Sequence, residues 1–260
     1  MRPLKLENLD QIPGKRLKAD EKFNFRCHAD VSCFNRCCHN LNLFLYPYDV
    51  LRLKTNLNMD SDHFLDQYVD IVLRKGNYFP DVLLKMTEDE HHSCCFLSPE
   101  GCNVYNDRPD TCRSFPMEKG MLASSSKGSV EMVYFFRPPD FCMGSKESDI
   151  HTPESWTCDQ QAEVYERMTI KWAELKQMFT TNPWGSQGPD SPKGKMAFMA
   201  AYNLDRFRQF IFESTFLTRY KVKSANLKKI KTDDYQLLLF AFEWIKLFVW
   251  GKPSNKIRPR

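Results

Sequence analysis

The sequence lacks the long apolar run that a membrane-crossing helix requires. Its most apolar stretch, residues 236–250, is interrupted by Glu243 and Lys246, and a crossing helix needs about 20 predominantly apolar residues. The first 23 residues carry charges throughout and contain no apolar core of a secretory signal. We therefore expect a cytoplasmic protein without a transmembrane span.

A strong charge of one sign is also missing. The formal net charge is +4, and basic residues alternate with acidic ones along most of the chain, which argues against a nucleic-acid partner. A basic tail over residues 251–260 could contact an anionic partner, but we expect a solvated, disordered terminus. The partner we expect is a protein or redox partner whose identity the sequence does not give.

Motifs for nucleotide chemistry are absent as well. The sequence has no GxGxxG loop and no P-loop, no internal repeat, and no recognisable Ser–His–Asp or Cys–His catalytic pairing. A catalytic residue is therefore not assigned.

Cysteine, in contrast, is abundant and unevenly placed. Eight of the ten cysteines fall between Cys27 and Cys112, and the last hundred residues contain none. A chain of this length buries roughly 70–75% of its unfolded surface, so it needs no disulfides merely to fold. Disulfide scaffolds are usually shorter and secreted, so we expect reduced thiols available to a metal.

The cysteines form two sequence groups with short gaps, Cys27-x5-Cys33-x3-Cys37-Cys38 and Cys94-Cys95-x6-Cys102-x9-Cys112, and Cys142 follows. Crowded thiolates repel one another, so a cation that neutralises them is the favoured explanation. Adjacent cysteines are expected to point in different directions and could serve two sites. Iron–sulfur clusters accept such varied spacing more readily than zinc sites do, although four-thiolate zinc sites and plain buried thiols stay open.

The residues from Cys95 to Pro116 carry a more specific pattern, with Gly101-Cys102, Tyr105, Arg108-Pro109, Cys112-Arg113 and Phe115-Pro116. Residues 25–144 thereby resemble the YkgJ-type cysteine-cluster family, a zinc- or iron-chelating domain. The resemblance implies eight metal ligands: Cys27, Cys33, Cys37, Cys38, Cys95, Cys102, Cys112 and Cys142. The chain departs from the family in longer gaps around Cys33 and in Met143, where proline is more usual. Cys94 and Cys158 lie outside the set, and we expect Cys158 to be a core thiol.

Several side chains near the cysteines are candidates for supporting roles. Arg108 and Arg113 flank Cys112 and could bind a cofactor by donating hydrogen bonds to sulfur, or could hold loops by bonding backbone carbonyls. Tyr105 and Phe115 are expected to shield the site from water. The histidines beside the cysteines, His28, His39, His91 and His92, are expected to be exposed loop residues, with ligation as the alternative.

The expected fold is mainly α with irregular loops, with α+β as the alternative. We expect a lead-in over residues 1–22, a cysteine-cluster domain over 23–150, a helical region over 151–250 and the basic tail. Helices are predicted at 47–54, 61–75, 154–179, 195–220 and 232–250, and strands at 81–86 and 129–136.

The leading functional hypothesis is an iron–sulfur protein, with a 4Fe-4S cluster, that acts in electron transfer or in a redox or modification reaction on a partner. An iron–sulfur oxidoreductase is the enzymatic form of this hypothesis. The alternatives are a non-enzymatic zinc-binding module and a protein-lysine methylase-like enzyme. The last rests on analogy with a flagellin lysine methylase that carries a related cysteine region.

Overall fold

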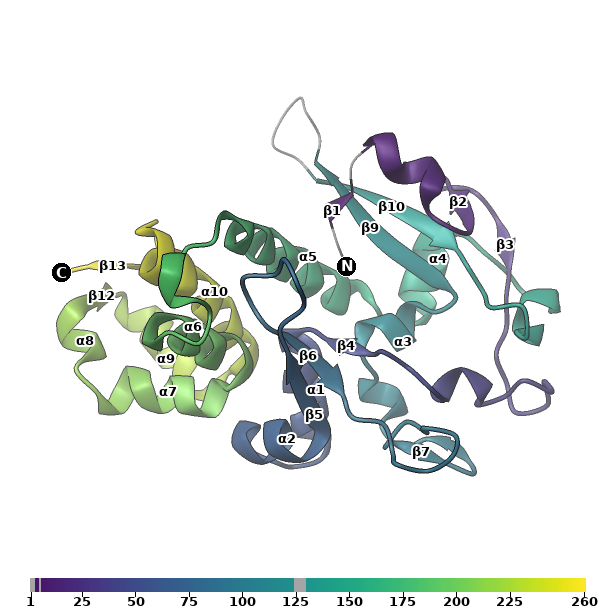
Figure 1. Ribbon diagram of the computed structural model, residues 1–260, viewed down its shortest axis with the longest axis horizontal. Helices are drawn as coiled ribbons and strands as arrows, with labels where there is room; N and C mark the ends of the chain where they lie inside the picture. The colour runs from purple at the N-terminus through teal and green to yellow at the C-terminus, as the bar shows by residue number, and fades with distance from the viewer. Residues whose placement is uncertain (1–2, 5, 124–129) are drawn as a thin grey trace. The chain divides into compact units, whose positions relative to one another are not determined.

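The computed structural model describes residues 3–4, 6–123 and 130–260 of the chain (Figure 1). The chain forms two compact units. Unit 1 comprises Met1–Leu43 and Met86–Ala173, and unit 2 comprises Phe44–Lys85 and Glu174–Arg260. The division falls inside helix α5 (Glu163–Met178). Of the residues that the structure describes, about 48% are helical and 17% lie in strands, so the fold is mixed α+β and not purely helical.

Unit 1 is built on a four-stranded sheet with the order β1-β9-β10-β2. Strands β9 and β10 form its antiparallel centre, with Val133 opposite Gly120. The predicted strand at 129–136 is confirmed from Val130 onward, and Ser129 lies outside the described residues. The lead-in over residues 1–22 contributes strands β1 and β2 to this sheet, and its Leu9 and Leu17 side chains are buried. The strand bounds are β1 Pro3–Leu4, β2 Lys15–Leu17, β9 Met117–Ala123 and β10 Val130–Phe136.

Short elements beside this sheet carry the cysteine loops. A core of Phe23, Phe25, Met117 and Trp156 includes the Cys142 side chain, and the rings of Phe25 and Trp156 lie 5.3 Å apart, edge to face. The core therefore fixes the base of the loops that present the thiols. The elements are β3 Phe23–Asn24 paired with β11 Ile150–His151, β7 Leu97–Ser98 paired with β8 Gly101–Cys102, α3 Asp110–Ser114 and α4 Pro153–Asp159.

The predicted long helix at 154–179 is two helices. Helix α4 ends at Asp159 and α5 begins at Glu163. Between them Gln161 adopts a left-handed backbone conformation with φ of 51°, which an α-helix does not accommodate. The interruption frees the Gln160 carbonyl, which accepts a hydrogen bond from Arg113.

Unit 2 starts with a small sheet of order β4-β6-β5 and two helices. The predicted helix at 47–54 and strand at 81–86 are confirmed as α1 and β6. The predicted helix at 61–75 ends at Tyr68, because the β-branched Val69, Ile71 and Val72 pair with β6 as strand β5. Asp60 caps α2 by accepting a hydrogen bond from the His63 N–H at 2.9 Å. The bounds are β4 Phe44–Leu45, α1 Pro47–Asn56, α2 Ser61–Tyr68, β5 Val69–Val72 and β6 Asp81–Leu84.

The rest of unit 2 is largely helical. The predicted helix at 195–220 is three helices, whereas the last predicted helix is confirmed and begins after its cap, Asp233. Phe207, Phe240 and Trp244 are buried in the unit's core. The bounds are α6 Pro192–Tyr202, α7 Leu204–Glu213, α8 Phe216–Arg219, β12 Tyr220–Val222, α9 Ser224–Thr232, α10 Asp234–Trp250 and β13 Ile257–Pro259.

Candidate metal centre

All ten cysteines belong to unit 1, and all are free thiols. Nine of them lie on loops and short elements: the segment after β3, a 3-10 turn at Arg36–Cys38, the β7–β8 hairpin with the residues before it, helix α3, and the loop after β10. Cys158 lies in helix α4, as predicted for a helical segment. However, its side chain is exposed, so the expectation of a core thiol is wrong.

The first thiol group consists of Cys27, Cys33, Cys37 and Cys142. The Cys27 thiol interacts electrostatically with the other three, and Cys142 interacts with Cys33 and Cys37. The backbone N–H of Met143 also donates a hydrogen bond to the Cys33 sulfur at 3.1 Å. This last contact gives a reason for the departure from proline at position 143, because proline has no N–H to donate.

The second thiol group consists of Cys38, Cys94, Cys95, Cys102 and Cys112. Cys38 interacts electrostatically with Cys94 and Cys112, and Cys102 interacts with Cys94. Cys94 and Cys102 also interact with Cys37 of the first group, so the two groups adjoin. The Cys94 N–H donates to the Cys38 carbonyl at 2.7 Å, so the two cysteine segments are joined through their backbones. Cys94 thus lies among the predicted ligands, although the resemblance left it out. The sequence repeats an adjacent pair, Cys37-Cys38 and Cys94-Cys95, but this repetition alone does not place Cys94 beside the other thiols.

The two adjacent pairs have the same internal arrangement. The Cys38 thiol is hydrogen-bonded to the Cys37 sulfur, and this bond lowers the pKa of Cys37 to about 7. In the same way the Cys95 thiol lowers the pKa of Cys94 to about 7. The donor in each pair has its pKa raised, first by that hydrogen bond and then by burial. The two sulfurs of each pair are therefore hydrogen-bonded to each other. The sequence-based expectation that adjacent cysteines point in different directions is wrong for both pairs.

Backbone N–H groups donate hydrogen bonds to three of the sulfurs. Cys94, Cys102 and Cys142 each accept a hydrogen bond from the N–H two residues further along, at Phe96, Val104 and Gly144. Such bonds favour the ionised sulfur that a metal requires. At Gly144 a side chain would place its Cβ 2.6 Å from the Arg26 carbonyl oxygen, so only glycine fits this turn.

Burial outweighs these hydrogen bonds at Cys102 and Cys142 and also opposes ionisation of Cys27. It raises the pKa of Cys27 to about 11, and it also raises the pKa of Cys102 and Cys142. In the part of the chain that the structure describes, no three His, Cys, Asp or Glu side chains already form a metal-binding arrangement. The donor set nevertheless fits a soft metal: it is all sulfur, it comes from adjacent loops, and its N–H partners suit thiolates. A bound cation would supply the charge that ionises the remaining thiols.

The two arginines have different partners. Arg113 donates from Nη1 to the Gln160 carbonyl and from Nη2 to the Asn106 carbonyl, both at 2.6 Å, which matches the loop-holding alternative. Arg108 also donates to a carbonyl, that of Tyr105, at 2.6 Å. It additionally interacts electrostatically with Cys102 and Cys112. Arg108 is therefore placed to offset thiolate charge while it holds its own loop.

The two aromatic residues expected to shield the site, Tyr105 and Phe115, also differ in their surroundings. Tyr105 is 57% exposed and lies under the Arg108 guanidinium, 3.9 Å from it. It does not shield the site, so that expectation is wrong. Phe115 packs against the buried Phe25 with ring centroids 5.8 Å apart, next to the Cys142 side chain.

The histidines near the cysteines have other partners. His39 shares a hydrogen bond of 3.1 Å with the Ser93 hydroxyl, and His28 lies 3.5 Å from Asp30 and 3.6 Å from Glu147. His91 and His92 are exposed. These contacts favour the loop interpretation and leave sulfur as the main donor at the site.

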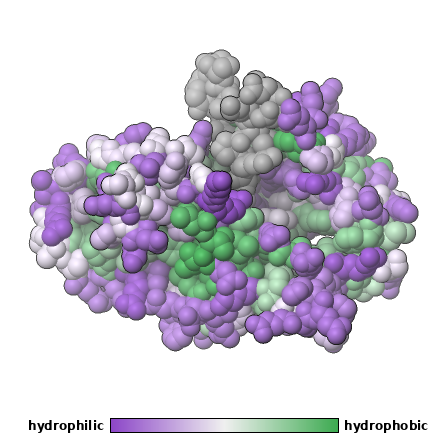
Figure 2. Space-filling view, in the orientation of Figure 1, coloured by the Kyte–Doolittle hydropathy of each residue, from purple (hydrophilic) through white to green (hydrophobic). Residues whose placement is uncertain are grey.

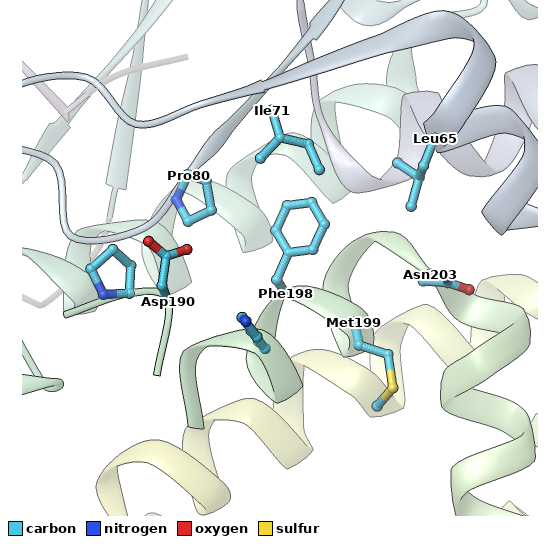
Figure 3. Close-up of a pocket in the computed structure, with 9 residues that line it drawn as sticks. Leu65, Ile71, Pro80, Asp190, Phe198, Met199 and Asn203 are labelled. Atoms are coloured by element: carbon cyan, nitrogen blue, oxygen red, sulfur yellow. The ribbon is translucent and has the colours of Figure 1, made fainter. Parts of the chain in front are cut away.

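Unit 2 contains a separate cavity of about 250 Å³. Figure 3 shows the Phe198 ring pointing toward Ile71, with Leu65 and Met199 beside it and Asp190 at one side. Its lining contains no cysteine, so the cavity is not part of the thiol cluster.

No helix in the described part of the chain is long and apolar enough to cross a membrane.

Comparison with known proteins supports a metal centre. No solved structure matches the chain. The model of a family described as "Putative zinc- or iron-chelating domain" matches residues 26–159, which is just over half of the sequence and includes all ten cysteines. The chain therefore belongs to the CxxCxxCC family of zinc- or iron-chelating domains.

Proposed function

We propose that the eight predicted ligand cysteines hold an iron–sulfur cluster and that the protein passes electrons to or from a partner. The observation that carries this proposal is that nine thiols from five separate segments of unit 1 lie close enough to interact with one another electrostatically. Several of them accept backbone N–H bonds that stabilise thiolate. Crowded sulfur of this kind is tolerated best when a cation neutralises it.

Iron–sulfur chemistry is favoured over zinc by the composition of the site. A structural zinc ion takes four ligands, commonly in paired short spacings, whereas the gaps within the two sequence groups of cysteines vary from none to nine residues, which iron–sulfur clusters accept more readily. The nearby histidines are paired elsewhere or exposed, which leaves an all-sulfur set. Two four-thiolate zinc sites are the alternative.

A bound cluster would supply one-electron transfer. The chain's own residues would tune that chemistry. Arg108 and the backbone N–H groups offset negative charge on sulfur, and hydrogen bonds to sulfur are among the factors that set a cluster's reduction potential. The exposed side of Cys27 gives a partner a near approach to the first thiol group.

The test is metal and sulfide analysis of the full chain purified without oxygen. We expect iron, acid-labile sulfide and broad absorption at roughly 400 nm. Cys38→Ser should lose metal, and the matched change Cys158→Ser should keep it. A colourless protein with about one or two zinc ions per chain would establish the alternative. A protein that contains neither iron nor zinc would refute both the iron–sulfur proposal and the zinc alternative.

A further inference from the structure

The C-terminal residues form a strand, so the expectation of a disordered tail is wrong. Strand β13 pairs antiparallel with β12, and Lys221 lies opposite Arg258. The Arg260 N–H donates to the Arg219 carbonyl at 2.9 Å, which extends the pairing by one position. The tail is ordered because Ile257, its single large apolar residue, is only 1% exposed.

The pairing brings together two segments that contain no acidic residue. Residues 219–231 and 252–260 contribute ten basic side chains: Arg219, Lys221, Lys223, Lys228, Lys229, Lys231, Lys252, Lys256, Arg258 and Arg260. The whole chain has a net charge of +4, so without these ten cations the remainder would carry −6. The positive charge is therefore concentrated in one part of unit 2.

Alternation along the two strands separates charge from packing. Tyr220, Val222 and Ile257 are buried or half-buried, while Lys221 and Arg258 are exposed. We call the cationic positions of this two-stranded sheet and its flanking residues the basic ribbon; they are Arg219, Lys221, Lys223, Lys256, Arg258 and Arg260. Figure 2 shows the end of unit 2 that carries the C-terminus as mostly hydrophilic surface. The lysines of α9 follow β12 directly along the chain.

The ribbon breaks a local rule of sheet stability. Like charges directly opposite each other destabilise a strand pair, and here Lys221 faces Arg258. Leaving Lys256 aside, none of the ten cations has a salt-bridge partner among the described residues. Protection of the strand edge would need only a charge of either sign, and one acid would relieve the repulsion. Local conflicts of this kind are expected at functional sites.

We propose that the basic ribbon binds the phosphate backbone of a nucleic-acid duplex. The major groove of B-form DNA admits a two-stranded ribbon, and cations along both strands can contact the phosphates of a duplex. The earlier expectation of no nucleic-acid partner rested on charges that alternate along the sequence, which does not hold for these two segments.

Other polyanions fit less well. The exposed large apolar residues of the described chain are Ile71, Leu73, Tyr78, Tyr105 and Ile150, and none lies on the ribbon, so it has no group to insert into a lipid surface. The absence of an exposed aromatic side chain there also removes the stacking platform that single strands use. An added peptide strand is disfavoured because Pro259 in β13 has no N–H to donate.

The experiment is fluorescence anisotropy of labelled 20-base-pair DNA and RNA duplexes titrated with the full chain. Six phosphate contacts predict a slope of about −5 in log affinity against log salt, and a loss of roughly 10³-fold between 50 and 200 mM salt. Binding weaker than about 100 µM at 50 mM salt would overturn the proposal.

Lys221→Glu is the decisive variant. It converts the like-charge pair into an ion pair with Arg258, so the melting temperature should stay level or rise, while duplex affinity falls about tenfold or more. Lys75→Glu, which makes the same change at an exposed residue in the β5–β6 turn, should leave affinity within about twofold. If Lys221→Glu does not fold, the double variant Lys221→Gln/Arg258→Gln tests the same loss. Equal losses for Lys75→Glu and Lys221→Glu, or tighter binding to anionic vesicles or polyglutamate than to duplex, would refute the proposal.

Discussion

Replacement of Met143 by proline should separate metal affinity from fold stability. The Met143 N–H donates to the Cys33 sulfur at 3.1 Å, and proline removes that donor alone. Met143 is the first residue of a 3-10 turn, and the preceding Cys142 is already extended with φ −77° and ψ 109°, a conformation that suits a following proline. The variant is therefore expected to fold.

The size of the effect follows from the contact. A hydrogen bond to a charged group contributes about 1.5–3 kcal/mol, which corresponds to roughly a 10- to 100-fold loss of metal affinity. In the metal-free chain the same bond goes to a thiol and contributes about 0.5–1.5 kcal/mol, and the restriction of the unfolded chain by proline offsets about 0.4–1 kcal/mol of that loss. The stability of the metal-free chain should therefore change by less than about 1 kcal/mol while metal affinity falls, and a general loss of structure would not produce that combination.

The assay is competition between the loaded protein and a chelator, with whichever of zinc or iron the purified protein contains. Urea unfolding of the metal-free protein provides the stability measurement. Met143→Ala keeps the N–H and is the matched control, with unchanged metal affinity. If Met143→Pro also left metal affinity unchanged, Cys33 would not be a ligand that depends on this bond.

Four further predictions test other contacts. Cys158→Ser should leave metal content unchanged, and metal loss would return this exposed thiol to the ligand set. The pKa of Cys37 and of Cys94 is lowered to about 7 in the folded chain. Ionisation of these two thiols therefore stabilises the folded chain at pH values above the ordinary thiol pKa, and this stabilisation is lost as the pH falls through 7. Alkylation of these two thiols, followed by mass spectrometry on metal-free protein, should therefore rise with a midpoint near pH 7. Arg113→Met should destabilise the metal-free chain by about 2–4 kcal/mol in urea, because two backbone carbonyls lose their donor; an unchanged midpoint would contradict this. Lys54→Met removes one buried partner of Asp205 and Asp234, which keep their contacts with Arg208, so it should cost about 1–3 kcal/mol of stability, yet metal per folded chain should not change.

Local sequence pattern predicted those elements that depend on local chemistry. Helix α1, strand β10 and the start of α10 follow from apolar spacing and a capping aspartate. Where a tertiary partner decided the outcome, the pattern failed. Residues after Tyr68 have helical spacing, but pairing with β6 makes them a strand.

The candidate site shows the same division. Clustered cysteines predicted a metal centre and its family, and the family match bears this out. The position of Cys94 could not be predicted, because it depends on a backbone bond to Cys38, which is 56 residues away in sequence. In the sequence, Met143 is a departure from the family pattern, whereas in the structure its N–H donates a hydrogen bond to the Cys33 sulfur. An isolated sequence shows which side chains are present but not where backbone donors point.

The discontinuity of unit 1 has a consequence for synthesis of the protein. Cys27 leaves the ribosome 115 residues before Cys142, and all of the residues of unit 2 from 44 to 85 emerge in between. At about 5–20 residues per second, the earliest thiols wait roughly 6–23 s for the last member of their group. During that interval they are exposed to oxidants and to the wrong metal, because the first thiol group is incomplete until residue 142 has been translated.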